Sequence, residues 1–441
     1  MATKIGLLDF TSSLFAAEAD SGPKPKVTVL LVQRKTGGGL TYPTATTEQL
    51  QQIKELFVKT LKDGAARFGV ELDLQAEPVT DVNASLARIK KTAPDGLIII
   101  ANALHQRKLV SQLVEKRGDV PTIVYSNVTA FIPHYRHWVK FPRTFLAATE
   151  DVGYLATAVR MFRTLWDMKN LRLLHCPTKD YYKEYNKTAD SDELRAIADF
   201  YIKNATKVVE PTKEQVFAAA KHYITMRRLL EKTGCNGVTV TGPLCTGAIP
   251  PNANPACLAV SKLHDDGIPA ACGKDVDSAK CMRMMFSLIG LPGFMGNTAA
   301  DTVNNTLLIT HCTSSLKLEG PDETYRAPYM LRDFHSMGGV TVMAAWPVGR
   351  EVTVLDFLDK TTVIVGEGPI VANTDNIAQP PCGGCRTSVD IAVEGIPDIL
   401  AVKCPTFHHY VVLGRYKQSI VNYCKLAGLK CFDLTAKTQL A

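Results

Sequence analysis

The chain has 441 residues, of which 46% are hydrophobic and 21% are charged, and its formal net charge is +7. This length exceeds the roughly 100 to 200 residues of one typical domain, and the composition excludes a largely disordered chain. The basic residues form no stripe interleaved with aromatic residues, which argues against a nucleic-acid partner. No apolar run approaches the roughly 20 residues that span a bilayer, so we expect no membrane partner.

The chain contains twelve cysteines, and most of them lie in apolar stretches, as Cys257, Cys272 and Cys312 do. A disulfide framework is typical of short secreted chains with a small core, which this chain is not. Free cysteine behaves as a small apolar residue inside a core. We therefore expect reduced thiols and a cytoplasmic location.

The first predicted domain covers residues 25–150 and follows an N-terminal arm over residues 1–24. Asp9 interrupts the apolar run of the arm, which argues against a signal peptide. From residue 27 onwards, apolar β-branched runs alternate with segments of helical periodicity, as in a parallel sheet with crossover helices. Strands are predicted at 27–32, 70–74, 96–101, 122–126 and 144–148, and helices at 47–68, 84–91 and 106–116.

The same alternation continues through a second predicted domain, residues 151–300. Helices are predicted at 154–166, 192–203, 213–233 and 276–288, and strands at 171–176, 206–209, 237–241, 268–272 and 293–295. The pattern therefore predicts a second parallel α/β layer.

The pattern changes in the third predicted domain, residues 301–441. Short apolar runs follow one another without intervening helices, which is typical of an antiparallel sheet or barrel. These runs are 306–310, 339–344, 351–357, 361–365, 388–393 and 410–413, and a helix is predicted at 417–427. The predicted fold class is thus α/β, with two parallel-sheet domains followed by a β-rich, barrel-like domain.

Polar residues follow a buried strand near residue 272, and this is the first segment that could carry chemistry. A predicted helix that contains Cys257 and Ser261 leads into the strand, and Asp275 follows it. Open α/β sheets bind ligands at the carboxyl ends of their strands. The alternative interpretation is a turn with solvated aspartates.

A histidine, His311, directly follows the predicted strand 306–310. Histidine changes charge near neutral pH and can bind a metal ion or transfer protons. Asn297 and Asp301 precede it in the sequence and could join it in one site. The alternative is a histidine with a purely structural role.

A third segment offers four possible zinc ligands. Cys382 and Cys385 are followed by Cys404 and His408, and this set satisfies a tetrahedral count of thiolate and imidazole donors. The sequence leaves open whether these residues hold a structural zinc ion or are free thiols around a turn.

Six short segments come in the same order as in bacterial short-chain relatives of the L-fucose and L-arabinose isomerases. The chain from about residue 235 to its end resembles that family, whereas the first half agrees with it only in predicted architecture. The segments are 255–261 (PACLAVS), 267–272 (GIPAAC), 293–296 (GFMG), 311–313 (HCT), 384–387 (GCRT) and 408–409 (HH).

The resemblance implies two Rossmann-like domains and a β-barrel domain, with interconversion of an aldose and a ketose as the reaction. Family members bind Mn²⁺ or a similar divalent ion through a glutamate, an aspartate and a histidine. The ion holds two adjacent sugar oxygens, while a carboxylate moves a proton between neighbouring carbons. The resemblance also implies a homo-oligomer, with a trimer or hexamer expected.

Transferred to this chain, the family's histidine ligand falls on His408. The glutamate position is occupied by Gly273, and the residue nearest the aspartate position is Asn297. Asp275 stands two residues beyond the glutamate position. The expected roles are catalytic for Asp275 and His311, metal-binding for His408, Asn297 and Asp301, and substrate-binding for His409, Cys257, Ser261 and Arg386.

The expected function is that of an aldose–ketose isomerase-like enzyme that acts on a small carbohydrate. The alternative, which the missing glutamate at Gly273 favours, is a sugar-binding or regulatory relative that binds no metal and catalyses no reaction.

Overall fold

The computed structural model describes most of the chain as two compact units, which we treat separately. The N-terminal unit contains the described residues of 13–169 and 418–430, and the barrel unit contains those of 170–417 and 431–440. The described residues are 23–33, 46–75, 77–102, 106–127, 135–246, 255–301, 303–320, 326–335, 338–374, 385–393 and 408–434. The three predicted domain ranges stay a prediction.

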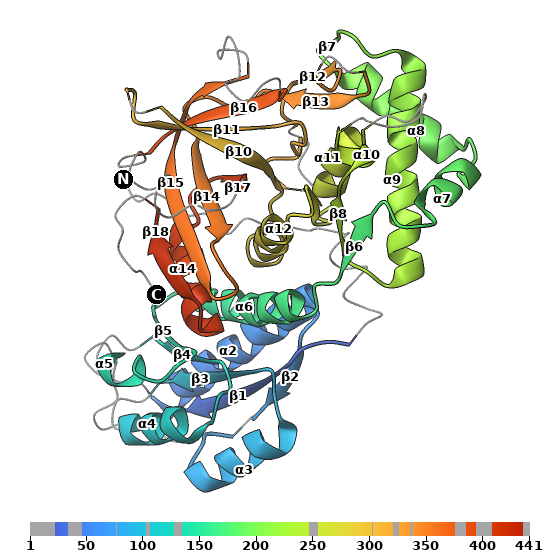
Figure 1. The fold of residues 1–441 in the computed structure, drawn as a ribbon. Coiled ribbons are helices and arrows are strands. Elements are labelled where there is room, and N and C mark those ends of the chain that lie inside the picture. Colours follow the sequence, from blue (N-terminus) through green and yellow to red (C-terminus); the bar gives the residue numbers. More distant parts are fainter. Residues whose placement is uncertain are drawn as a thin grey trace. The chain divides into compact units, whose positions relative to one another are not determined.

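Five parallel strands form the sheet of the N-terminal unit, in the order β2-β1-β3-β4-β5 (Figure 1). The strands are β1 (Lys26–Val32), β2 (Glu71–Leu74), β3 (Gly96–Ala101), β4 (Thr122–Ser126) and β5 (Thr144–Ala148). Every residue of β3 and β4 is buried, as expected for central strands covered on both faces. The predicted parallel sheet is confirmed, and each predicted strand lies within one residue of its observed bounds.

Helices connect these strands, and their ends follow from local capping. The helices of this unit are α2 (Thr47–Phe68), α3 (Val82–Thr92), α4 (Arg107–Lys116), α5 (Tyr135–Trp138), α6 (Tyr154–Lys169) and α14 (Lys417–Ala427), of which α14 belongs here from residue 418 on. Helix α2 begins at a capping box formed by Thr46 and Gln49 and ends at Gly69, whose φ of 62° suits glycine.

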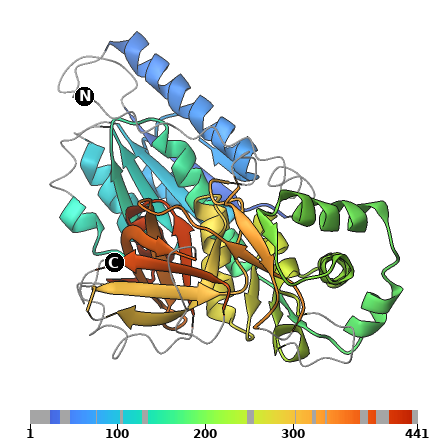
Figure 2. The same cartoon turned by 90° about the horizontal axis from the view of Figure 1, so that it is seen from above.

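The first part of the barrel unit contains a smaller parallel sheet with helices. Its three strands are β6 (Leu173–Cys176), β8 (Gly237–Val240) and β9 (Ala270–Cys272). Helices α7 (Tyr181–Lys187) and α8 (Asp192–Asn204) both pack on α9 (Lys213–Thr233), as Figures 1 and 2 show in green. The other helices are α10 (Pro243–Thr246), α11 (Cys257–Asp265) and α12 (Val276–Leu288).

Two strands that the sequence predicted for this sheet lie elsewhere. Strand β7 (Lys207–Val208) pairs with β12 (Tyr329–Arg332), which pairs in turn with β13 (Thr341–Ala344). Strand β10 (Gly293–Asp301) joins the antiparallel barrel. The prediction that 206–209 and 293–295 belong to a second parallel layer is therefore wrong, because hydrophobicity identifies a strand but not its partner.

Six antiparallel strands close into a barrel in the C-terminal region (Figure 1). Their order is β14-β17-β10-β11-β16-β15, and the pairing of β14 with β15 closes the ring. Besides β10 these are β11 (Thr306–His311), β14 (Glu351–Phe357), β15 (Thr362–Asn373), β16 (Thr387–Ala392) and β17 (His408–Leu413), and β18 (Lys430–Asp433) extends the sheet beside β15. The predicted β-rich, barrel-like region is confirmed.

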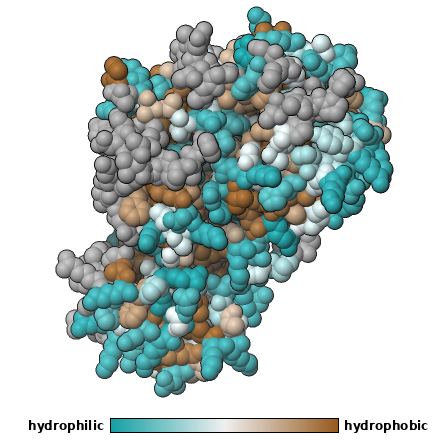
Figure 3. Space-filling view, in the orientation of Figure 1, coloured by the Kyte–Doolittle hydropathy of each residue, from teal (hydrophilic) through white to brown (hydrophobic). Residues whose placement is uncertain are grey.

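The outer face of the barrel unit over α7, α8 and α9 is mainly hydrophilic (Figure 3). In the part of the chain that the structure describes, no helix combines the length and the apolar character needed to cross a membrane.

Gly293 allows β10 to pass close to β17 in the barrel wall. A Cβ atom at Gly293 would lie 1.9 Å from the carbonyl oxygen of Val411, so any side chain would displace a backbone. We expect Gly293→Ala to lower the free energy of unfolding by about 1 to 3 kcal/mol, as overpacking typically does. Urea unfolding measures this loss. Thr298→Ala, at a half-buried position of the same strand, is the control, and equal stability of the two variants would contradict the prediction.

Candidate functional site

The carboxyl end of β9 opens into a tight turn that leads to α12. The strand ends at Cys272, and Gly273 and Lys274 both have positive φ values, 67° and 60°. Asp275 then caps α12, because its carboxylate accepts hydrogen bonds from the backbone N–H and the hydroxyl of Ser278, each at 2.9 Å. A Cβ atom at Gly273 would lie 3.8 Å from His408 Cε1. The position at which the resemblance places a glutamate therefore faces His408.

Asp275 and His408 form a hydrogen-bonded pair. The Nδ1 atom of His408 lies 2.9 Å from Oδ2 of Asp275, and the two side chains are 11% and 18% exposed. Burial raises the pKa of Asp275, but the hydrogen bonds from His408 and Ser278 outweigh burial and lower it overall. Asp275 is therefore ionised, and its carboxylate accepts a hydrogen bond from Nδ1–H of His408.

His311, at the end of β11, lies beside this pair. Its ring is 5.2 Å from the ring of His408 at an angle of 83°. Its Nδ1 lies 2.8 Å from the hydroxyl of Thr313. Burial, and after it the charge of His408, lower the pKa of His311 to about 3, so its imidazole is neutral at neutral pH. The structure thus brings together the two residues expected to be catalytic, Asp275 and His311, and the expected metal ligand His408.

Asn297 of β10 is the register partner of His408 in β17. The structure does not bring Asp301 to this place, because it stands four residues further along β10, roughly 14 Å away. The Asp301 carboxylate instead accepts the backbone N–H groups of Val303 and Asn304 in an exposed turn.

His409 and Ser261, both expected to bind substrate, are fully buried. Successive residues of a strand point to opposite faces, so His409 faces away from His408. Its Nδ1 lies 4.0 Å from the buried carboxylate of Asp356. Neither residue is accessible to a substrate in this structure, so their predicted roles gain no support.

Arg386 holds two segments of the barrel unit together. Its Nε donates to the carbonyl oxygen of Asp333 at 3.0 Å, and its guanidinium forms an ion pair with the carboxylate of Asp333. The two side chains are 16% and 13% exposed. Arg386 was expected to bind substrate, but this pairing with Asp333 already occupies its guanidinium.

Cysteine side chains gather close to the histidines. Cys272 donates a hydrogen bond to the sulfur of Cys245, which lowers the pKa of Cys245 despite its burial. Cys257, another expected substrate contact, packs in a buried cluster with Cys312, Phe334 and Cys385. Cys385 accepts a hydrogen bond from Cys312, and this lowers the pKa of Cys385 and raises that of Cys312.

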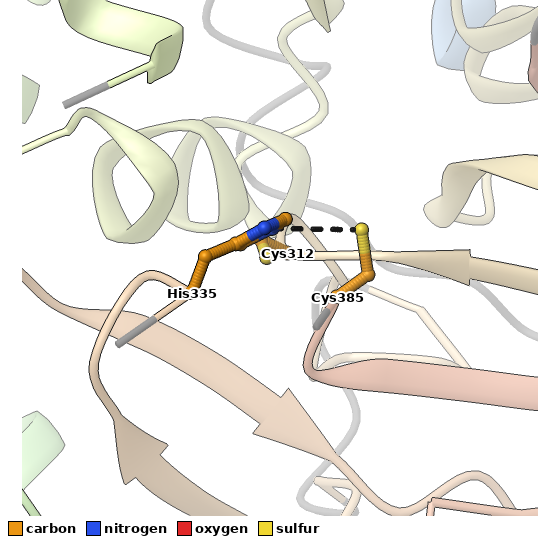
Figure 4. A group of neighbouring side chains, drawn as sticks. All are labelled: Cys312, His335 and Cys385. Atoms are coloured by element: carbon orange, nitrogen blue, oxygen red, sulfur yellow. Dashed lines mark hydrogen bonds between the residues drawn. The ribbon is translucent and has the colours of Figure 1, made fainter. Parts of the chain in front are cut away.

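His335 lies beside Cys312 and Cys385 of this cysteine cluster. Its Nε2 lies 3.7 Å from the sulfur of Cys385, and both atoms lie with the sulfur of Cys312 in a group whose members are all within 4.8 Å of one another (Figure 4). His335 is not predicted from the sequence as a site residue, because no motif surrounds it. Its one local signal is visible only in the structure, where its backbone φ is 51°.

The described residues do not fit the manganese site that the resemblance implies. Gly273 supplies no donor and Asn297 would bring no charge, so of the three family ligand positions His408 alone keeps a strong metal ligand. Manganese favours several oxygen ligands, whereas the one group of three close donors among the described His, Cys, Asp and Glu residues is made of sulfur and nitrogen. The predicted zinc ligands Cys382 and Cys404 lie outside the described residues.

Comparison of the sequence with protein-family models and with curated proteins gave no match. Membership of the L-fucose/L-arabinose isomerase family therefore stays a prediction from the six sequence segments.

Proposed function

We propose that the chain catalyses an aldose–ketose isomerisation of a small carbohydrate, with His408 and Asp275 as its acid–base pair. The observation that carries the proposal is the 2.9 Å hydrogen bond between His408 Nδ1 and the Asp275 carboxylate at the carboxyl end of β9. This pairing leaves His408 Nε2 free to accept a proton, and it places a negative charge beside the imidazolium that then forms.

In the proposed reaction, Nε2 of His408 removes the proton from the carbon next to the carbonyl group. The electron pair of that C–H bond forms the double bond of an enediol, and the carbonyl oxygen takes up a proton from water, which leaves hydroxide. His408 returns its proton to the former carbonyl carbon, while the hydroxyl on the carbon that lost its hydrogen gives its own proton to the hydroxide and becomes the new carbonyl. No atom is gained or lost, and Asp275 stays ionised throughout.

The reaction is tested by incubating the protein in D2O with aldopentoses, aldohexoses and their ketose isomers. We expect the hydrogen on the carbon next to the carbonyl group to exchange for deuterium. Proton NMR measures this exchange, first without and then with added divalent metal ions. His408→Gln should slow this exchange about 100- to 10,000-fold, since general acid–base groups contribute this much.

Asp275→Asn is the matched variant, because asparagine caps a helix as well as aspartate but carries no charge. It should fold normally and show a smaller loss than His408→Gln. Asp301→Asn, in the exposed turn, should leave the rate unchanged. Wild-type protein that exchanges no proton of any of these sugars, or a His408→Gln variant that exchanges it at the wild-type rate, would contradict the proposal.

A second candidate is a sugar-binding or regulatory relative without catalysis, which the glycine at position 273 facing His408 favours. It predicts that a sugar raises the melting temperature in the presence of EDTA while no proton exchanges. Exchange dependent on His408 would exclude it.

The other expectations remain proposals on the same resemblance: a homo-oligomer, trimer or hexamer, and a reduced second Rossmann-like domain around β6, β8 and β9. The buried free thiols of Cys257, Cys272 and Cys281 support a cytoplasmic location.

A further inference from the structure

Three donor atoms from separate segments, those of Cys312, His335 and Cys385, meet in the barrel unit, and one of the distances between them matches a tetrahedral metal site. Zinc bonds of about 2.3 Å to sulfur and 2.0 to 2.1 Å to nitrogen, at a tetrahedral angle, place the two ligand atoms about 3.6 Å apart. The distance between Cys385 Sγ and His335 Nε2 is 3.7 Å. The sulfur of Cys312 lies within 4.8 Å of the Cys385 sulfur and of a ring nitrogen of His335 (Figure 4).

The segments that carry these donors are tied to one another. Arg386, next to Cys385, binds both the carbonyl oxygen and the carboxylate of Asp333, two residues before His335. Thr313, next to Cys312, forms a β-bridge with Val342, whose carbonyl oxygen accepts the hydroxyl of Thr387. The three ligand positions are therefore fixed by contacts other than their own.

His335 is held in a conformation that a non-glycine residue seldom adopts. Its φ of 51° lies in the left-handed region, and it packs against the ring of Phe334 at 4.3 Å. Such a backbone costs free energy and persists where the surroundings or a function require it. Here it places the imidazole beside two sulfurs.

The alternative to a metal site is ordinary packing of thiols in an apolar core. Cys281, a buried cysteine near the Leu355 carbonyl, is an example of such packing. Hydrogen bonds join the same three residues, from Cys312 to Cys385 and between Cys385 and His335, and a bound ion would replace the protons in these bonds. The donor set also selects the ion, because thiolate and imidazole ligands favour zinc over magnesium, calcium and manganese.

We propose that Cys312, His335 and Cys385 bind one Zn²⁺ ion. Within the described residues the group offers three donors, and zinc in proteins is held by three or four such ligands. The proposal does not depend on the sugar reaction. It concerns a different ligand set from Cys382, Cys385, Cys404 and His408, with Cys385 in common.

The test uses the full chain, purified under reducing conditions, stripped with EDTA and reloaded with ZnCl2. We expect about one equivalent of zinc by elemental analysis, and with CoCl2 a thiolate-to-cobalt charge-transfer band and the strong visible absorption of tetrahedral cobalt. Cys312→Ser and Cys385→Ser should lose the charge-transfer intensity of one sulfur each and weaken zinc binding by more than about 100-fold. This exceeds the 10- to 100-fold typical of outer-shell changes.

His335→Gln keeps both thiols and should also weaken zinc binding. It replaces the cysteine variants in the test if one of them fails to fold. Arg386→Lys, a change in a positioning residue, should weaken zinc binding about 10- to 100-fold while the cobalt band keeps its position. Cys281→Ser is the matched buried-thiol control and should bind zinc as the wild type does.

Less than about half an equivalent of zinc in the reloaded wild type would overturn the proposal, as would unchanged binding by the Cys312→Ser/Cys385→Ser double variant. A Cys312–Cys385 disulfide found by peptide mapping in protein that binds no zinc would overturn it too. Failure of the sugar proposal leaves these outcomes unaffected, because metal binding is measured directly.

Discussion

Replacing Asp265 by alanine is expected to lower the free energy of unfolding by about 3 to 5 kcal/mol. Asp265 is the last residue of α11, and its side chain is 1% exposed. Its Oδ1 accepts the hydroxyl of Ser315 at 2.5 Å and the backbone N–H groups of Leu316 and Lys317 at 2.8 and 2.9 Å. The variant would leave these three donors without their acceptor, and an unsatisfied buried polar group costs about 1 to 3 kcal/mol.

The acceptor oxygen of Asp265 is expected to stabilise the fold more than its charge does, although Nη1 of Arg326 lies 4.0 Å from its Oδ2. Burial raises its pKa, and the hydrogen bonds from Ser315, Lys317 and Leu316 offset this only in part. Asp265→Asn keeps an acceptor oxygen and removes the buried charge, so it should cost much less than Asp265→Ala. Chemical denaturation measures the free energy of unfolding of both variants. Asp199→Ala, at an exposed position of α8, is the control. Equal losses for alanine and asparagine would show that the charge, rather than the acceptor, is what the fold requires.

Much of the fold is visible in the sequence because local patterns report burial. The run 96–101 is apolar at nearly every position, and β3 is buried throughout. Strand β7 shows the limit of this reasoning. Its two residues are exposed, and its partner β12 lies more than 100 residues away. No local pattern specifies such a pairing, which depends on how distant segments pack.

Strand β10 shows a related limit. The sequence predicted only residues 293–295, because the rest of the strand, from Asn297 to Asp301, is polar or small and half-buried. Strand β11 pairs with this part along its whole length, whereas β17 pairs with residues 293–297. Backbone pairing is independent of side-chain type, so hydropathy underestimates the length of such strands.

The candidate site was predictable in part. The sequence singled out Asp275, His311 and His408, and the structure places them together. The alternation of a strand could also have indicated that His408 and His409 face opposite sides. His335 could not be predicted, because its approach to Cys312 and Cys385 depends on how the hairpin of β12 and β13 packs on β16 of the barrel. For Arg386, sequence identifies the residue but not its partner Asp333.

Acidification from pH 7 to pH 5 is expected to destabilise the barrel unit through buried histidines. Burial lowers the pKa of both His264 and His409 to about 4, although a backbone contact partly opposes this in each. In His264 the Nε2 atom lies 2.6 Å from the carbonyl oxygen of Ala270, so a second proton on the buried Nδ1, which has no hydrogen-bond partner among the described residues, would find no acceptor.

Because the folded pKa lies below the unfolded value of about 6.5, the unfolded chain binds more protons between pH 4 and pH 6.5. Stability therefore falls as the pH falls through this window, by about 2 kcal/mol per histidine at pH 5. Urea unfolding at pH 7 and pH 5, in the presence of EDTA, measures the loss. His264→Gln keeps a donor for the Ala270 carbonyl but cannot titrate, so its loss between the two pH values should be about 2 kcal/mol smaller than that of the wild type. A variant whose stability depends on pH as steeply as the wild type would show that His264 is already protonated in the folded state or that its site opens to water.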